Sequence, residues 1–141
     1  MSGLSRAYSF IEIKSIEEDA RIIRGVATTP TPDRLKDVVN PLGAKFELPI
    51  PHLWQHNHDQ PIGHVIEATP KATGIPFVSQ IAKTDEPGML KDLLDMAWQS
   101  MKMRLVRAVS IGFQPLKHAF LDNRGIEFEE WSWYELSPVT V

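Results

Sequence analysis

The chain has 141 residues, a formal net charge of −3 and no cysteine. Its length predicts one domain with a hydrophobic core, and its content of 43% hydrophobic and 23% charged residues is ordinary for a globular protein. The negative net charge does not indicate a basic surface for binding nucleic acid. The lack of cysteine excludes disulfides, thiolate metal sites and cysteine nucleophiles. No apolar run approaches the ~20 residues that span a bilayer, and the N-terminus lacks a signal-peptide pattern.

Short strands are expected through the first half of the chain, where alternating apolar residues are separated by turn signals. The candidate strands cover residues 8–13, 22–28, 52–56, 62–69 and 75–82, with a short helix over residues 42–46. A turn is expected at residues 57–61, and the last two of these strands should form a hairpin.

An amphipathic helix should follow. Thr84 or Asp85 can cap it, Pro87 suits its first turn, and an apolar stripe continues at helical spacing. The stripe consists of Leu90, Leu93, Leu94, Ala97, Trp98 and Met101.

Strands are expected again over residues 108–118, 126–131 and 133–139, with a turn at residues 122–125. About seven short strands and one or two helices predict an α+β fold, mainly antiparallel β, built as a small barrel or sandwich with helices at its side.

Ser110 occupies an unusually bare strand face. Val109, Ile111 and Phe113 alternate at period two and can enter a core, which leaves Ser110 on the other face between Ala108 and Gly112. A hydroxyl displayed this way leaves room for a substrate backbone, so Ser110 is a candidate nucleophile. The alternative is that small residues merely line a strand under a loop.

Histidines are concentrated in a short segment that contains His52, His56, His58 and His64. An imidazole suits the general base that a serine nucleophile requires, because its unperturbed pKa lies near ~6.5. The spacing of His56, His58 and Asp59 also fits a zinc site, which is the rival interpretation.

Glu135 is a carboxylate in an otherwise aromatic strand, and it is a candidate third member that accepts the second ring N–H of a catalytic histidine. If that strand is unbroken, Glu135 shares a face with Trp131 and Trp133. An exposed or arginine-paired carboxylate is the alternative.

Four segments together resemble the prohead maturation protease family of tailed phages. The histidine motif is Leu53-Trp54-Gln55-His56 with Gln60-Pro61-Ile62-Gly63, the serine motif is Ala108–Phe113, and the closing motif is Glu135–Thr140. The N-terminal signature is Gly25-Val26-Ala27 with Asp33-Arg34 and Asp37-Val38-Val39. Their order and gaps agree over about residues 22 to 141.

The resemblance implies a fold related to herpesvirus assemblin, a small β-barrel with flanking helices, and one catalytic domain over residues 1–141 whose C-terminal tail is absent. It makes Ser110 the nucleophile and His56 the base, with Glu135 as third member and His58 or His118 as alternatives. The Asp33, Arg34 and Asp37 group is expected to be loop structure.

The resemblance further implies a serine endopeptidase without metal or other cofactor. Its substrates would be capsid scaffold or the scaffolding region of the major capsid protein, and itself, inside the prohead in the host cytoplasm or encoded by a prophage. Self-association as a homo-oligomer is compatible with it, whereas nucleic acid and membrane are not expected partners. A non-catalytic capsid assembly module and a histidine-metal hydrolase are the alternative functions.

Overall fold

The structure, a computed structural model, describes residues 5–12, 15–17, 20–33 and 35–140. These residues form ten strands, one α-helix and one 3₁₀ turn. In chain order the elements are β1 (Ser5–Glu12), β2 (Ser15–Glu17), β3 (Ile22–Val26), β4 (Val38–Val39), η1 (Pro41–Gly43), β5 (Ala44–Lys45), β6 (Ile50–Trp54), β7 (Asn57–Ala68), β8 (Pro76–Ile81), α1 (Met89–Lys102), β9 (Ala108–Phe120) and β10 (Ile126–Val139). The α+β class with mostly β structure is confirmed. None of the described helices is both long and apolar enough to cross a lipid bilayer.

All the described strands belong to one mixed sheet with the order β1-β9-β10-β6-β7-β8-β3-β2, and β4 and β5 add to β10. β10 pairs in parallel with β4, β5 and β6, whereas the other neighbours are antiparallel. β1 also contacts β3, so the two ends of the strand order approach each other. No ladder among the described residues joins these ends, so the expected barrel is observed as an open sheet.

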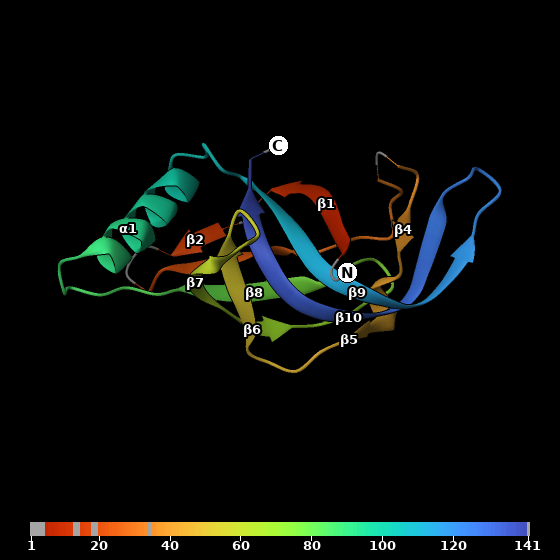
Figure 1. Cartoon of the computed structure of the whole chain (residues 1–141), viewed down its shortest axis with the longest axis horizontal. Coiled ribbons are helices and arrows are strands. Elements are labelled where there is room, and N and C mark those ends of the chain that lie inside the picture. The colour runs from red at the N-terminus through yellow and green to blue at the C-terminus, as the bar shows by residue number, and fades with distance from the viewer. Residues whose placement is uncertain (1–4, 13–14, 18–19, 34, 141) are drawn as a thin grey trace.

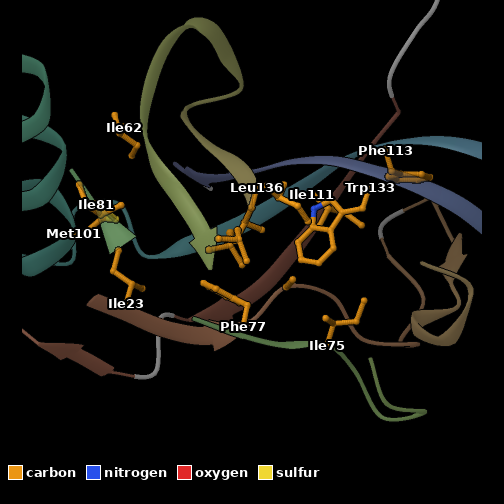
Figure 2. Close-up of a cluster of buried hydrophobic side chains, with 14 of the residues drawn as sticks. Ile23, Ile62, Ile75, Phe77, Ile81, Met101, Ile111, Phe113, Trp133 and Leu136 are labelled. Atoms are coloured by element: carbon orange, nitrogen blue, oxygen red, sulfur yellow. The ribbon is translucent and has the colours of Figure 1, made fainter. Parts of the chain in front are cut away.

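The long strands β9 and β10 form the curved spine of the molecule in Figure 1, with α1 at one end of the long axis and the distal β9–β10 hairpin at the other. The hydrophobic core lies on the face of this spine that bears Val109, Ile111 and Phe113, as the period-two pattern predicts. Trp133 and Leu136 of β10 are buried with them, and the cluster also includes side chains from β3, β6, β7, β8 and α1 (Figure 2).

Helix α1 buries the last four residues of the predicted stripe, namely Leu94, Ala97, Trp98 and Met101, whereas Leu90 in its first turn is exposed. The helix begins at Met89, after Gly88 with a φ of 149°, and its first turn has no side-chain cap. The prediction that Thr84 or Asp85 caps the helix is therefore wrong. The Thr84 hydroxyl instead accepts a hydrogen bond from the N–H of Glu86 in the preceding turn, because a short polar side chain bonds equally well to a local backbone group outside a helix.

Arg21 connects α1 to the sheet through polar contacts. Its guanidinium donates to Asp95 of the helix at 2.7 Å and to the carbonyl of Ala82 at 3.1 Å, and it lies 5.8 Å from the centre of a ring of Trp98. Lys91 and Arg21 together lower the pKa of the Asp95 carboxyl. A salt bridge and a cation–π contact therefore supplement the apolar packing of the helix.

His52 is a buried histidine on β6 with 1% of its surface exposed, and neither of its ring nitrogens has a hydrogen-bond partner among the described residues. Burial, and secondarily the charge of His64, lower the pKa of His52 from 6.5 to about 3. The folded protein therefore holds this imidazole neutral over a pH range in which the unfolded chain protonates it.

We predict that the free energy of unfolding falls as the pH drops from 6.5 toward about 3, because unfolded His52 binds a proton in that range and folded His52 does not. The contribution of His52 has a slope of at most about 1.4 kcal/mol per pH unit. Urea unfolding at several pH values should show that His52→Leu removes this component. Equal slopes for the two proteins would contradict the prediction.

Candidate active site

Ser110 lies near the start of β9, on the strand face opposite the core residues Val109 and Ile111. Its register partners are Tyr8 of β1 and Ser137 of β10, so it lies in the middle of a three-strand segment. Its neighbours on this face, Ala108 and Gly112, add almost no side-chain volume. The space beside the hydroxyl is therefore available to side chains from β10 and from the β6–β7 turn.

A β-bulge brings Glu135 to the same face as Ser110. Trp133 is opposite Phe113 and Glu135 is opposite Gly112, which leaves Tyr134 as an extra residue in β10. The Trp133 indole N–H donates to the carbonyl of Glu135 at 2.8 Å across this bulge. The extra residue reverses the alternation, so the expectation that Glu135 shares a face with the core tryptophans is wrong.

His56 lies in the tight turn between β6 and β7. Trp54 pairs with Asn57, and the two residues between them, Gln55 and His56, have φ angles of 53° and 61°. Two consecutive positive φ values are the conformation of a type I′ hairpin turn, which side chains other than those of Gly, Asn and Asp adopt reluctantly. The sequence prediction misplaced this turn at residues 57–61, which belong to β7.

The misplacement has a local cause. Asn57, Asp59 and Pro61 are strong turn residues, and the Asn57 side chain does accept a hydrogen bond from the N–H of Asp59 at 2.9 Å. This local contact forms inside an irregular strand rather than at a reversal of the chain.

Ser110, His56 and Glu135 form a continuous hydrogen-bonded array. The Ser110 hydroxyl is 2.8 Å from Nε2 of His56, and Nδ1 of His56 is hydrogen-bonded to Oε2 of Glu135. Because an ionised carboxylate only accepts hydrogen bonds, Nδ1 carries the proton, and Nε2 of the neutral ring accepts from the Ser110 hydroxyl. All three residues are buried. The sequence analysis selected these residues, and the fold brings them together from β9, the β6–β7 turn and β10.

Further polar groups of β10 hold this array. The Ser137 hydroxyl donates to Oε1 of Glu135 at 2.7 Å and accepts from the backbone N–H of His56 at 3.1 Å. The side chain of Gln55 donates to the Thr140 hydroxyl at 2.9 Å and accepts from the Thr140 N–H at 3.1 Å. The backbone N–H of Gln55 also donates to the carbonyl of Pro138 at 3.3 Å. No role is predicted from the sequence for Ser137 or Gln55, although the spacing of two between Glu135 and Ser137 indicates a shared strand face.

The absence of a side chain at Gly112 leaves the space that the Glu135 carboxylate occupies. A Cβ atom at position 112 would lie 2.3 Å from Oε2 and 2.7 Å from Cγ of Glu135. Heavy atoms do not approach so closely, so any larger residue at this position displaces the carboxylate or the strand. The missing side chain is thus a steric requirement of the array.

The other candidates lie elsewhere. His58 is exposed on β7, and His118 lies in the distal β9–β10 hairpin beside Phe120. In the part of the chain that the structure describes, no three side chains of the metal-binding types gather into a cation site. Among these described residues, His56 is hydrogen-bonded to Ser110 and Glu135, so the rival zinc site with His58 and Asp59 is not formed.

Asp33 and Asp37 organise a loop. The Asp33 carboxylate accepts from the N–H groups of Leu35 and Asp37, and the Asp37 carboxylate accepts from the N–H of Ile126. The prediction of loop structure holds for these two residues, and Arg34 lies outside the described residues.

The chain is similar in sequence to two curated phage proteins. The chain is 52% identical over 138 residues to the capsid polyprotein of Pseudomonas phage PAJU2, with 97% of this chain and 21% of that protein covered. It is 28% identical over 142 residues to the prohead protease of Escherichia phage T5, with 92% of this chain and 63% of that protein covered. The chain thus spans about a fifth of the first relative and less than two thirds of the second. No family model matches the sequence.

The fold matches that of the capsid assembly protease of bacteriophage T4 with a TM-score of 0.61 and 8% sequence identity, and the match covers 96% of this chain and 97% of the other. At this identity the structural likeness concerns the fold alone. The chain is thus similar to the T5 prohead protease in sequence and to the T4 capsid assembly protease in fold.

Proposed function

We propose that the chain is the catalytic domain of a serine endopeptidase, with Ser110 as nucleophile, His56 as general base and Glu135 as the residue that orients His56. The observation that carries this proposal is the 2.8 Å contact between the Ser110 hydroxyl and Nε2 of His56. A serine hydroxyl is a weak nucleophile at neutral pH unless a neighbouring base takes its proton during attack.

In the proposed reaction, Oγ of Ser110 forms a bond to the carbonyl carbon of the scissile peptide while its proton passes to Nε2 of His56. The C–N bond then breaks, and His56 gives this proton to the leaving amine, which leaves an acyl-enzyme ester on Ser110. Water attacks the ester with His56 again as base, the bond between the acyl carbon and Oγ of Ser110 breaks, and His56 returns the proton to Oγ as the acid product leaves. The Glu135 carboxylate stabilises the imidazolium that forms in each half of the cycle. Because Ser110 is fully buried, a neighbouring segment must move before a peptide reaches Oγ.

The relatives indicate where such an enzyme would act. One is named a capsid polyprotein and another a prohead protease. We propose that the substrates of this chain are capsid scaffold or the scaffolding region of a major capsid protein, and the chain itself, and that cleavage takes place inside the assembling prohead. A non-catalytic assembly module would not require a buried carboxylate, imidazole and hydroxyl in this order, because burying such groups is costly unless each is hydrogen-bonded.

Replacing the nucleophile should abolish proteolysis. We predict that Ser110→Ala lowers the rate of self-processing and capsid-protein cleavage by at least about 10⁴-fold, because loss of the nucleophile removes the acyl-enzyme route. The measurement is cleavage in cells that produce the full-length protein with the capsid protein of the same phage. Ser79→Ala is the control, since Ser79 is equally buried on β8 and lies outside the array. Parental cleavage by Ser110→Ala would disprove the mechanism.

Neutralising the third member should leave the fold intact and slow the reaction. We predict that Glu135→Gln lowers kcat by about 10³- to 10⁴-fold, because an amide cannot hold the tautomer of His56 or balance the imidazolium charge. Glu130→Gln is the matched control on the same strand, because Glu130 pairs with Lys45 at the surface, at 3.2 Å. Equal rates for the two variants would exclude the orienting role of Glu135.

Filling the space at position 112 tests the same geometry without changing a polar group. We predict that Gly112→Ala lowers kcat by about 10²-fold or more, because a shift of about 1 Å in a catalytic group has an effect of this size. The added Cβ would lie 2.3 Å from Oε2 of Glu135. Cleavage kinetics and a thermal unfolding curve should be recorded together. A folded Gly112→Ala protein with parental kcat would contradict the prediction.

A further inference from the structure

We propose that Ser137 is a positioning residue, which fixes the imidazole of His56 by bonding at once to the backbone of His56 and to the carboxylate that orients its ring. The inference rests on the proposed function and assigns a part of the same site to a residue outside the triad.

The contacts of Ser137 close a ring of hydrogen bonds. The backbone N–H of His56 donates to Oγ of Ser137 at 3.1 Å, and the Ser137 hydroxyl donates to Oε1 of Glu135 at 2.7 Å. The other carboxylate oxygen, Oε2, accepts from Nδ1 of His56. These hydrogen bonds therefore connect the backbone of His56 to its own imidazole through the hydroxyl of Ser137 and the carboxylate of Glu135. Both the Cα position and the ring plane of His56 are constrained by the same two residues of β10.

The conformation of His56 explains why such a constraint is needed. Gln55 and His56 both have positive φ angles, which are energetically unfavourable for non-glycine residues. A turn of this kind relaxes unless the surrounding structure holds it. The two hydrogen bonds between Gln55 and Thr140 hold the first residue of the turn. The hydrogen bond from the N–H of His56 to the hydroxyl of Ser137 holds the second.

The same hydroxyl affects the charge of Glu135. A buried carboxylate needs donors for both oxygens. Ser137 supplies the donor for the oxygen that does not contact His56, so part of the negative charge is drawn away from the imidazole. Without this donor, the carboxylate would attract the imidazolium form more strongly, and the base would become available only at higher pH.

The chain offers a matched comparison. Ser79 on β8 is also fully buried, but its hydroxyl has no hydrogen-bond partner in the part of the chain that the structure describes. Removing that hydroxyl therefore deletes no hydrogen bond seen there, whereas removing the hydroxyl of Ser137 deletes two. Ser79→Ala therefore controls for the loss of a buried serine oxygen from the sheet.

The test measures covalent labelling of Ser110 in the full-length protein by a fluorophosphonate, as a function of probe concentration and pH. We expect Ser137→Ala to lower the maximal labelling rate about 10- to 100-fold through misplacement of the base. The probe concentration for half-maximal rate should stay unchanged, and the rising limb of the pH profile should move to higher pH. Ser137→Thr, which keeps the hydroxyl, should recover the parental limb and most of the rate, and Ser79→Ala should behave as the parent.

The outcomes separate this inference from the proposed function. Parental rate and pH limb in Ser137→Ala, with Glu135→Gln still impaired, would overturn the role of Ser137 and leave the triad intact. Equal losses in Ser137→Ala and Ser79→Ala, or in Ser137→Ala and Ser137→Thr, would show a purely structural effect and also overturn it. If the probe modifies a residue other than Ser110, or Ser110→Ala still cleaves, the proposed function itself is wrong.

Discussion

The site depends on one extra residue in β10. Over Trp131, Ser132 and Trp133 the strand alternates, with both tryptophans in the core, and the extra residue Tyr134 shifts this alternation by one position. Beyond the bulge, Leu136 enters the core opposite Ile111, and Glu135 is placed beside Gly112 on the face of Ser110. A regular strand would direct the carboxylate into the apolar core, where an ionised group is strongly disfavoured. The bulge thus lets one strand direct apolar side chains into the core and a carboxylate into the polar array. Bulges often redirect a side chain in this way next to functional sites.

A buried carboxylate then determines much of what surrounds it. Glu135 is 2% exposed, so its charge is tolerated only if donors meet its oxygens. His56 and Ser137 provide them, and Gly112 leaves the space in which they meet. The bare face around Ser110 is therefore explained by the volume of a carboxylate and an imidazole that come from other strands. Small residues on this face are as necessary as the polar ones.

The spacing of apolar residues along the sequence was sufficient to predict several of these features. The period-two burial of Val109, Ile111 and Phe113 placed Ser110 on the correct face, and helical spacing identified the buried side of α1. The bulge at Tyr134 was not predictable from alternation, because it is fixed by pairing with β9 and by the indole of Trp133. The turn at Gln55 and His56 was also missed, since neither residue favours positive φ and its conformation is held by β10, a strand about eighty positions away in sequence. The motif resemblance supplied the pairing of Ser110 with His56, which spacing alone left open.

The array is consequently a product of long-range assembly. The β9–β10 hairpin carries Ser110, Glu135 and Ser137, but His56 joins them only when β6 docks in parallel against β10, where His52 is the register partner of Leu136. β6 therefore holds a buried neutral imidazole at this junction, and the turn that follows β6 presents a second imidazole to the site four residues later. Since the folded state excludes the protonated form of His52, which the unfolded chain adopts in acid, the junction that positions His56 is destabilised as the pH falls below 6.5. The position of His56 in the site and the acid sensitivity of the sheet therefore both depend on the pairing of β6 with β10.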